Sequence, residues 1–183
     1  MSQMSDYLSH DEVEDAMPLS RREQFAWFQT NYNRMAPEDR YWKTLEIYSG
    51  DIFGFPKKYL IALKSIKPND YLKDLPNELT DVDPITVYRG TDALESVGTV
   101  RSGISWTINK NVAIWFSQRF CTTGKVFAAT IEKKKIIGFI TSRNEDEVVQ
   151  HCNVKNVVEI IPTQEEIRGA IEAHAKSIES HTF

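Results

Sequence analysis

The segment Pro84-Ile-Thr-Val-Tyr-Arg-Gly90 divides this chain into two parts of different character. The run from Ile85 to Arg89 is rich in strand-forming residues and is followed by glycine, which is typical of a β-strand that ends there. Similar runs follow it, whereas the sequence before it has helical spacing. We therefore expect a mainly helical N-terminal part over residues 1–80 and a strand-rich core over residues 84–161.

Further strand-like runs follow Gly90 at short intervals. They lie at Ile104–Thr107, Lys125–Ile131, Ile136–Ile140, Glu145–Gln150 and Val157–Ile161. The run Lys133-Lys134-Lys135 separates two of them and predicts a charged turn, which could also help to hold an anionic substrate. Helices packed beside an antiparallel or mixed sheet form an α+β fold, which is the fold class that we expect.

Helix starts are indicated by three capping boxes, in which a hydroxyl and a glutamate three residues later satisfy each other's backbone amides. The three pairs are Ser9 with Glu12, Ser20 with Glu23, and Thr163 with Glu166. After the second box, apolar residues recur at helical spacing at Phe25, Phe28, Tyr32 and Met35. Shorter helical pieces are expected at Tyr41–Tyr48 and Lys57–Ile66, and Trp27 and Trp42 are expected to pack or to face a partner.

Residues 109–120 return to helical spacing inside the strand-rich part, with Val112, Phe116 and Phe120 on one face. The last helix is expected to start at Thr163 and to run towards the end of the chain.

The bulk properties exclude several functional classes. The net charge of −4 gives no general electrostatic basis for binding nucleic acid. No apolar run approaches the roughly 18 residues that a membrane helix needs, and no secretion signal is recognised, so we expect a cytoplasmic protein without a membrane partner. Cys121 and Cys152 do not have metal or redox spacing and are expected to be free thiols, and no metal is expected.

Three short segments carry residues that can do chemistry together: Tyr88-Arg89-Gly90, Ser105-Trp106-Thr107 and Glu145-Asp146-Glu147. In a strand, residues two apart face the same side. Two hydroxyls and two carboxylates are therefore expected to point into one cleft, while Trp106 enters the core. An arginine at a strand end supplies a planar cation that suits a pyrophosphate.

This constellation resembles the arginine–serine–glutamate class of ADP-ribosyltransferases, with Arg89, a Ser-x-Thr motif and a Glu-x-Glu motif in the family's order. The resemblance covers about residues 84–161. Trp106 and Thr107 depart from the usual Ser-Thr-Ser motif, but both hydroxyl positions are retained. The resemblance implies a two-sheet core within a single domain and NAD as the co-substrate.

The resemblance also implies roles for the acids and hydroxyls. Glu147 would face the positive charge that develops on the ribose when nicotinamide leaves. Glu145 would activate or position the acceptor. Ser105 would hold the nicotinamide ribose and orient Glu147, and Thr107 would support the acids from behind.

The remaining roles concern binding of NAD. The backbone of Gly90 would bind the nicotinamide carboxamide, and Arg89 would bind the pyrophosphate, with Arg119 as a second candidate. Phe116 would stack on nicotinamide, although its helical spacing is equally typical of a core residue.

The expected activity is transfer of ADP-ribose from NAD to a macromolecule, with protein arginine as the first acceptor and RNA or DNA as the second. Two alternatives stay open: an NAD glycohydrolase, in which water is the acceptor, and an inactive member of the fold that acts as a binding or regulatory module. By analogy with the family, we expect an intracellular bacterial or phage toxin or effector that belongs to a toxin–antitoxin or phage-defence system. An antitoxin or another neutralising protein is then expected as a further partner.

Overall fold

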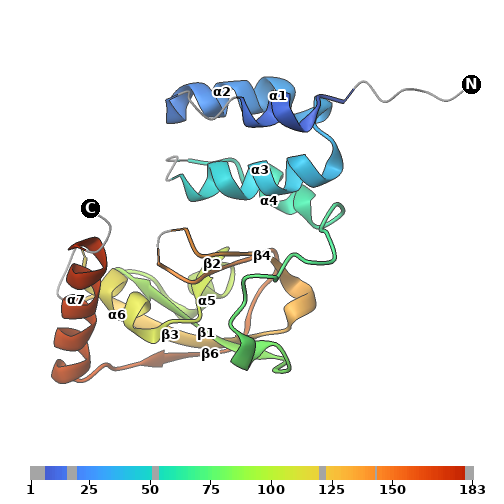
Figure 1. Ribbon diagram of the computed structural model, residues 1–183. Helices are drawn as coiled ribbons and strands as arrows, with labels where there is room; N and C mark the ends of the chain where they lie inside the picture. The colour runs from blue at the N-terminus through green and yellow to red at the C-terminus, as the bar shows by residue number, and fades with distance from the viewer. Residues whose placement is uncertain (1–6, 16–19, 51–53, 120–122, 143, 180–183) are drawn as a thin grey trace, which may run out of the picture. The chain divides into compact units, whose positions relative to one another are not determined.

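The computed structural model describes residues 7–15, 20–50, 54–119, 123–142 and 144–179. The chain divides into two compact units, Met1–Tyr71 and Leu72–Phe183, which Figure 1 shows in blue to cyan and in green to red. The first unit is helical and the second is an α+β unit with an antiparallel sheet. The helical part expected over residues 1–80 thus corresponds to a unit that ends at Tyr71.

The first unit begins its helices as the sequence predicts. Its elements are α1 (His10–Glu14), α2 (Arg21–Asn31), the 3-10 turn η1 (Tyr32–Arg34), α3 (Pro37–Ser49) and α4 (Lys57–Leu63). Both predicted capping boxes are present, with Ser9 before α1 and Ser20 before α2. Pro37 opens α3, where the missing N–H of proline removes no helical hydrogen bond.

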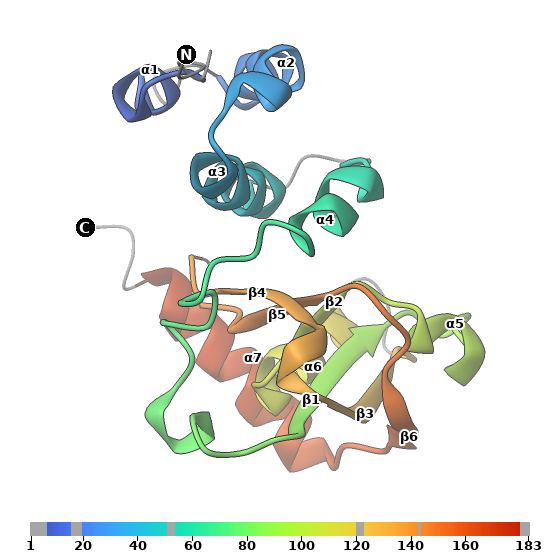
Figure 2. The same ribbon diagram turned by 90° about the vertical axis from the view of Figure 1, so that its right-hand side faces the viewer.

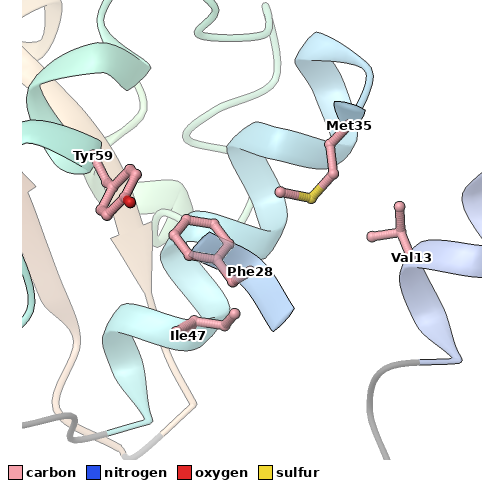
Figure 3. Close-up of a cluster of buried hydrophobic side chains, with 5 residues drawn as sticks. All are labelled: Val13, Phe28, Met35, Ile47 and Tyr59. Carbon is pink, nitrogen blue, oxygen red and sulfur yellow. The ribbon is translucent and has the colours of Figure 1, made fainter. Parts of the chain in front are cut away.

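The core of the first unit is built largely from aromatic rings. Figure 3 shows its buried cluster, formed by Val13, Phe28, Met35, Ile47 and Tyr59. The ring of Phe28 lies edge-on to that of Tyr59, with 5.0 Å between the centroids. Trp27 is half-buried against this cluster, as expected for a packing residue.

The six strands found among the described residues all lie in the second unit. Its elements are η2 (Asn77–Leu79), β1 (Ile85–Thr91), α5 (Val97–Arg101), β2 (Ser105–Thr107), α6 (Lys110–Gln118), β3 (Lys125–Ile131), η3 (Lys133–Lys135), β4 (Ile136–Ile140), β5 (Glu147–Gln150), β6 (Lys155–Ile160) and α7 (Gln164–Glu179). The predicted runs at β3 and β4 match the observed strands residue for residue. The third capping box, between Thr163 and Glu166, is also present at the start of α7.

The strands form one hydrogen-bonded sheet in the order β4-β5-β2-β1-β3-β6, and all neighbours are antiparallel. Two separate sheets were expected, so the described strands differ from the prediction in this respect. The halves β4-β5-β2 and β1-β3-β6 join where β1 pairs with β2, and this register consists of Tyr88 opposite Thr107. A short β2 of three residues explains why the junction is narrow.

Helices α6 and α7 pack together on the sheet (Figures 1 and 2). Their core cluster contains Ala113, Ile114, Val126 and Ala170. The buried side of α6 therefore differs from the prediction, because Val112 and Phe116 are only half-buried and Phe120 lies outside the described residues. The small residues Ala113 and Ser117 take the buried positions because α6 approaches β1 and the start of β3 very closely, at Gly90 and Gly124.

Candidate functional site

The three segments singled out in the sequence lie on adjacent strands. Arg89 is on β1, the Ser-x-Thr motif forms β2, and Glu147 is the first residue of β5. Thr107 lies opposite Tyr88 on one side and opposite Glu147 on the other. Residues directly opposite each other in an antiparallel pair share a face of the sheet. Thr107 and Glu147 therefore lie on the same face as Tyr88. Arg89 is the next residue of β1, and from there its side chain reaches β2.

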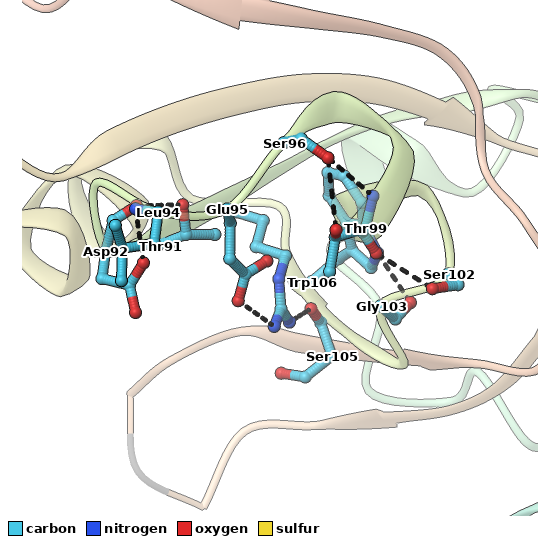
Figure 4. Close-up of polar contacts among 11 residues, drawn as sticks. Thr91, Asp92, Leu94, Glu95, Ser96, Thr99, Ser102, Gly103, Ser105 and Trp106 are labelled. Carbon is cyan, nitrogen blue, oxygen red and sulfur yellow. Dashed lines mark hydrogen bonds and ion pairs between the residues drawn. The ribbon is translucent and has the colours of Figure 1, made fainter.

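Arg89 is fixed against the backbone of β2. Figure 4 shows Glu95, Gly103 and Ser105, the residues that surround its guanidinium. Its Nη1 donates a hydrogen bond to the carbonyl oxygen of Ser105 at 2.6 Å. Its Nη2 is 4.0 Å from a carboxylate oxygen of Glu95, which is a loose ion pair. The Nε–H is buried and has no hydrogen-bond partner among the described residues. The guanidinium is thus oriented while part of its hydrogen-bonding capacity remains unused.

Gly103 makes room for this guanidinium. A Cβ atom at Gly103 would come within 3.2 Å of both Nε and Cζ of Arg89. The carbonyl oxygen of Gly103 also accepts a hydrogen bond from the indole N–H of Trp106 at 3.0 Å. Trp106 is 2% exposed, so it enters the core as predicted and its polar atom is satisfied there.

Thr107 holds the acidic segment in place. Its hydroxyl donates to the carbonyl oxygen of Glu145 at 2.6 Å and accepts from the backbone N–H of Asn109 at 2.9 Å. The side chain is buried, so both hydrogen bonds lie away from water. The backbone N–H of Ile108 donates to the carbonyl oxygen of Asp146 at 3.2 Å and adds a second link. Ser105, by comparison, is half-buried, and its backbone carbonyl is the acceptor for Arg89.

The two glutamates of the Glu-x-Glu motif have different environments. Glu147 begins β5 and is 4% exposed, whereas Glu145 precedes the strand and is half-buried. The prediction that the strand begins at Glu145 is wrong, because β5 starts at Glu147, so strand alternation does not determine the direction of the Glu145 side chain. Asn144 and Asp146 adopt the left-handed region, with φ of 54° and 47°, so the backbone turns on both sides of Glu145.

Gly90 is required by packing against α6. A Cβ atom at this position would lie 1.9 Å from the carbonyl oxygen of Ala113 and 2.7 Å from the backbone nitrogen of Ser117. Its direct environment is therefore helix backbone, which accounts for a glycine independently of any ligand. β1 also continues through Gly90 to Thr91, two residues beyond Arg89, the last residue of the predicted strand.

Phe116 and Arg119 lie towards the C-terminal end of α6. The Phe116 ring meets Trp115 edge-on at a centroid distance of 4.8 Å. The guanidinium carbon of Arg119 is 5.2 Å from the Trp115 ring centroid and 6.0 Å from that of Phe116, within the range of cation–π contact. Arg119 is exposed and Phe116 is half-buried, so neither is a plain core residue.

A pocket of about 300 Å³ lies beside the acidic segment, between α6 and α7. Its lining includes Asn109, Trp115, Asn144, Asp146 and His174. The imidazole of His174 stacks on Trp115 with 3.5 Å between the ring centroids. Burial, and then the charge of Arg119, lower the pKa of His174 below its ordinary value. Sequence reasoning missed His174 as a site neighbour, since only the packing of α7 on α6 brings it there.

Three further findings concern metal ligands, the cysteines and membrane-spanning helices. Among the residues that the structure describes, no group of three or more His, Cys, Asp or Glu side chains is arranged to hold a metal ion. Cys152 is a half-buried thiol, and Cys121 lies outside the described residues. No helix in the described part of the chain is both long and apolar enough to cross a membrane.

Comparison with known proteins does not identify a relative: no family model, no curated protein and no solved structure matches this chain. Any functional assignment therefore rests on the residues of the site and on their geometry.

Proposed function

We propose that this chain is an ADP-ribosyltransferase that cleaves NAD and transfers ADP-ribose to a macromolecular acceptor. The observation that carries the proposal is that Arg89, Ser105 and Glu147 lie on three adjacent strands, β1, β2 and β5, with Arg89 hydrogen-bonded to the backbone carbonyl of Ser105. These residues are separated by up to 58 positions in the sequence, from 89 to 147.

Arg89 is suited to the pyrophosphate of NAD. A buried N–H without a hydrogen-bond partner costs about 1–3 kcal/mol, and Arg89 has such a group at Nε. The ion pair with Glu95 is long, at 4.0 Å, so it leaves most of the positive charge available. An anionic ligand with two neighbouring oxygens would satisfy the fork of donors that a guanidinium offers.

Glu147 is suited to the ribose. Cleavage breaks the bond between the anomeric carbon and the nicotinamide nitrogen, and both electrons leave with nicotinamide. The ribose carbon then carries a developing positive charge. A carboxylate that is 4% exposed acts on this charge with little screening by water. Ser105, on the neighbouring strand, would hold the ribose near this carboxylate.

Glu145 would serve the acceptor. It lies outside the strand and is half-buried, so an incoming group has more access to it than to Glu147. The nucleophile of the acceptor forms a bond to the anomeric carbon, and Glu145 would receive the proton that the nucleophile loses. A protein arginine is the first candidate for the acceptor, and RNA or DNA is the second.

The finer fold assignment belongs to the same proposal. The halves β4-β5-β2 and β1-β3-β6, joined at Tyr88 and Thr107, would correspond to the two sheets of an ADP-ribosyltransferase core. Phe116 and Arg119, on the helix that follows β2, would then be placed to contact NAD. An intracellular toxin or effector with a neutralising partner is the setting that we propose for such an activity.

Label transfer from NAD tagged on its adenylate part tests the proposal. The protein, Glu147→Gln and the control Glu159→Gln are each incubated with cell lysate, and the product is treated with protease or nuclease. Glu159 is an exposed glutamate on β6. Loss of an electrostatic stabiliser at the reacting centre lowers the rate by about 10²- to 10³-fold, and we expect this loss for Glu147→Gln alone.

The destination of the label identifies the acceptor. Label that protease removes and nuclease leaves is on protein, and the reverse pattern places it on nucleic acid. Release of nicotinamide that depends on Glu147, without transferred label, would make the chain an NAD glycohydrolase. A folded protein that neither releases nicotinamide nor transfers label would refute the proposal in favour of an inactive binding module.

A further inference from the structure

A second pocket lies at the other end of β1 from Arg89. It has a volume of about 270 Å³ and forms where β1 begins, β3 ends and β6 begins. Its lining includes Pro84, Thr130, Glu132, Lys135, Lys155 and Asn156. Arg89 is four residues along β1 from Ile85, which is about 13 Å in an extended strand. The pocket is therefore separate from the candidate NAD site.

Three lysines converge on the carboxylate of Glu132, and two of them, Lys135 and Lys155, line the pocket. The ammonium groups of Lys134, Lys135 and Lys155 lie 2.7, 3.0 and 3.3 Å from carboxylate oxygens of Glu132. The hydrogen bonds from Lys134, Lys135 and Lys155, in this order, lower the pKa of Glu132 to about 2. Glu132 is therefore ionised at neutral pH, and it acts as an internal anion for three cations.

The positive charge of this region exceeds its negative charge. Lys133, the first residue of η3, donates from its Nζ to the backbone carbonyl oxygens of Leu79 and Thr80. Asp83 accepts a hydrogen bond from the backbone N–H of Lys133 at 2.9 Å and is a second acid beside the cluster. Lys134, Lys135 and Lys155 thus share the one carboxylate of Glu132, and an anion entering the pocket would offset the excess of positive charge.

The backbone around the pocket is irregular in a way that exposes hydrogen-bond donors. The register between β3 and β6 shifts between Ala128 and Thr130, and Asn156 adopts a left-handed φ of 53°. The side-chain amide of Asn156 donates to the hydroxyl of Thr130 at 3.0 Å. Such bulges redirect side chains and end regular pairing. Here the bulge places a hydroxyl and an amide beside Lys155, which lies directly opposite Thr130.

We propose that this pocket binds a phosphate group, carried either by a small molecule such as a nucleotide or by the backbone of a nucleic acid. Lysine ammonium groups bind phosphate as mobile point charges, and the neighbouring hydroxyl and amide add directional hydrogen bonds. In the ligand-free protein, Glu132 occupies the place of the anion. Its ion pairs with the lysines must break when phosphate binds. Phosphate and Glu132 therefore compete for the same three cations.

This competition predicts opposite effects for two substitutions in the same pocket. Binding of inorganic phosphate and pyrophosphate to the full chain is measured by isothermal titration calorimetry at low ionic strength. The double variant Lys135→Gln/Lys155→Gln should bind at least ten-fold more weakly. Glu132→Gln should bind about five-fold more tightly, since it removes the competing charge. Lys176→Gln, which changes an exposed lysine on α7, should bind as the parent does.

The two sources of phosphate are separated with a labelled single-stranded oligonucleotide in fluorescence anisotropy. Oligonucleotide binding that falls steeply with salt and is lost in the double lysine variant assigns the site to nucleic acid. Phosphate and nucleotide binding without oligonucleotide binding assigns it to a small molecule. Phosphate affinity that is absent, or equal in parent and double lysine variant, or weakened in Glu132→Gln, would overturn the proposal.

The same variants separate this proposal from the proposed activity. Nicotinamide release from NAD should be unchanged in Lys135→Gln/Lys155→Gln, because the pocket lies at the far end of β1. A rise in the KM for NAD in that variant would show that the pocket belongs to the NAD site, and would refute a separate phosphate site.

Discussion

Replacement of Gly90 by alanine should strongly destabilise the second unit. A Cβ atom at position 90 would lie 1.9 Å from the carbonyl oxygen of Ala113, and real Cβ atoms essentially never come within 3.0 Å of another heavy atom. Restoring that separation requires α6 to move by about 1 Å away from β1. The clashing atoms belong to helix backbone, which cannot rotate away as a side chain would. Overpacking usually costs about 1–3 kcal/mol, and we expect about 3 kcal/mol or more here.

Gly169→Ala is the matched control for this change. Gly169 lies within α7, and a Cβ atom there would meet nothing within 4 Å. Alanine is favoured over glycine inside a helix by about 0.8–1.0 kcal/mol. The same chemical change should therefore stabilise the fold at position 169 and destabilise it at position 90.

Urea unfolding followed by circular dichroism and tryptophan fluorescence measures both effects as changes in the unfolding midpoint. Trp106 and Trp115 report on the second unit. A free energy of unfolding for Gly90→Ala within about 0.5 kcal/mol of the parent, which is the normal range for surface substitutions, would refute the close packing of α6 on β1. Destabilisation by both substitutions would instead show that alanine is poorly tolerated for reasons unrelated to that packing.

Three further predictions follow from individual contacts. Thr107→Val should lower the free energy of unfolding in urea by about 1–3 kcal/mol, because it leaves two buried backbone groups unsatisfied. It should also slow NAD cleavage, whereas Thr107→Ser should preserve both stability and cleavage. Equal effects of the valine and serine variants would contradict the role of the hydroxyl. Phe28 has 0% exposure, so Phe28→Ala should destabilise the first unit by about 3–5 kcal/mol. The change should appear as a loss of helical circular-dichroism signal at a lower temperature. Ile61→Ala, on the exposed face of α4, should leave that temperature almost unchanged. Because the pKa of His174 is lowered in the folded protein, the unfolded chain takes up a proton more readily. This residue should therefore reduce the free energy of unfolding as pH falls through and below the ordinary histidine pKa of 6.5. The loss of stability between pH 7.5 and 5.5 should be smaller in His174→Gln than in the parent, and an identical pH profile would contradict the burial of its ring.

The elements that could be predicted from the sequence are those determined by local pattern. β3 and β4 contain continuous runs of strand-forming residues, and the capping boxes before α1, α2 and α7 consist of residues three positions apart. Each of these signals acts within a few residues of itself. These predictions therefore do not depend on contacts with distant parts of the chain.

Features that depend on distant contacts could not be predicted in the same way. β5 was expected to include Glu145, because Glu145–Gln150 has strand-like composition. The hydrogen bond from Thr107 to the Glu145 carbonyl joins residues 38 apart, and the left-handed conformation of Asp146 interrupts the alternation. The buried side of α6 was misassigned for a similar reason. A close approach at Gly90 favours small residues on that side over the larger Val112 and Phe116.

The Glu-x-Glu motif shows what is lost when a pattern is interpreted without its fold. From the sequence, Glu145 and Glu147 were expected to lie on one face of the same strand. In the structure, Glu147 lies in a strand and is nearly inaccessible, while Glu145 lies on the turn before it and is half-buried. The proposed chemistry needs this inequality. Stabilising a ribose cation favours a carboxylate shielded from water, whereas removing a proton from an acceptor requires a carboxylate that the acceptor can reach. In the proposed mechanism, the left-handed residue that breaks the predicted strand would therefore also let the two glutamates perform different tasks.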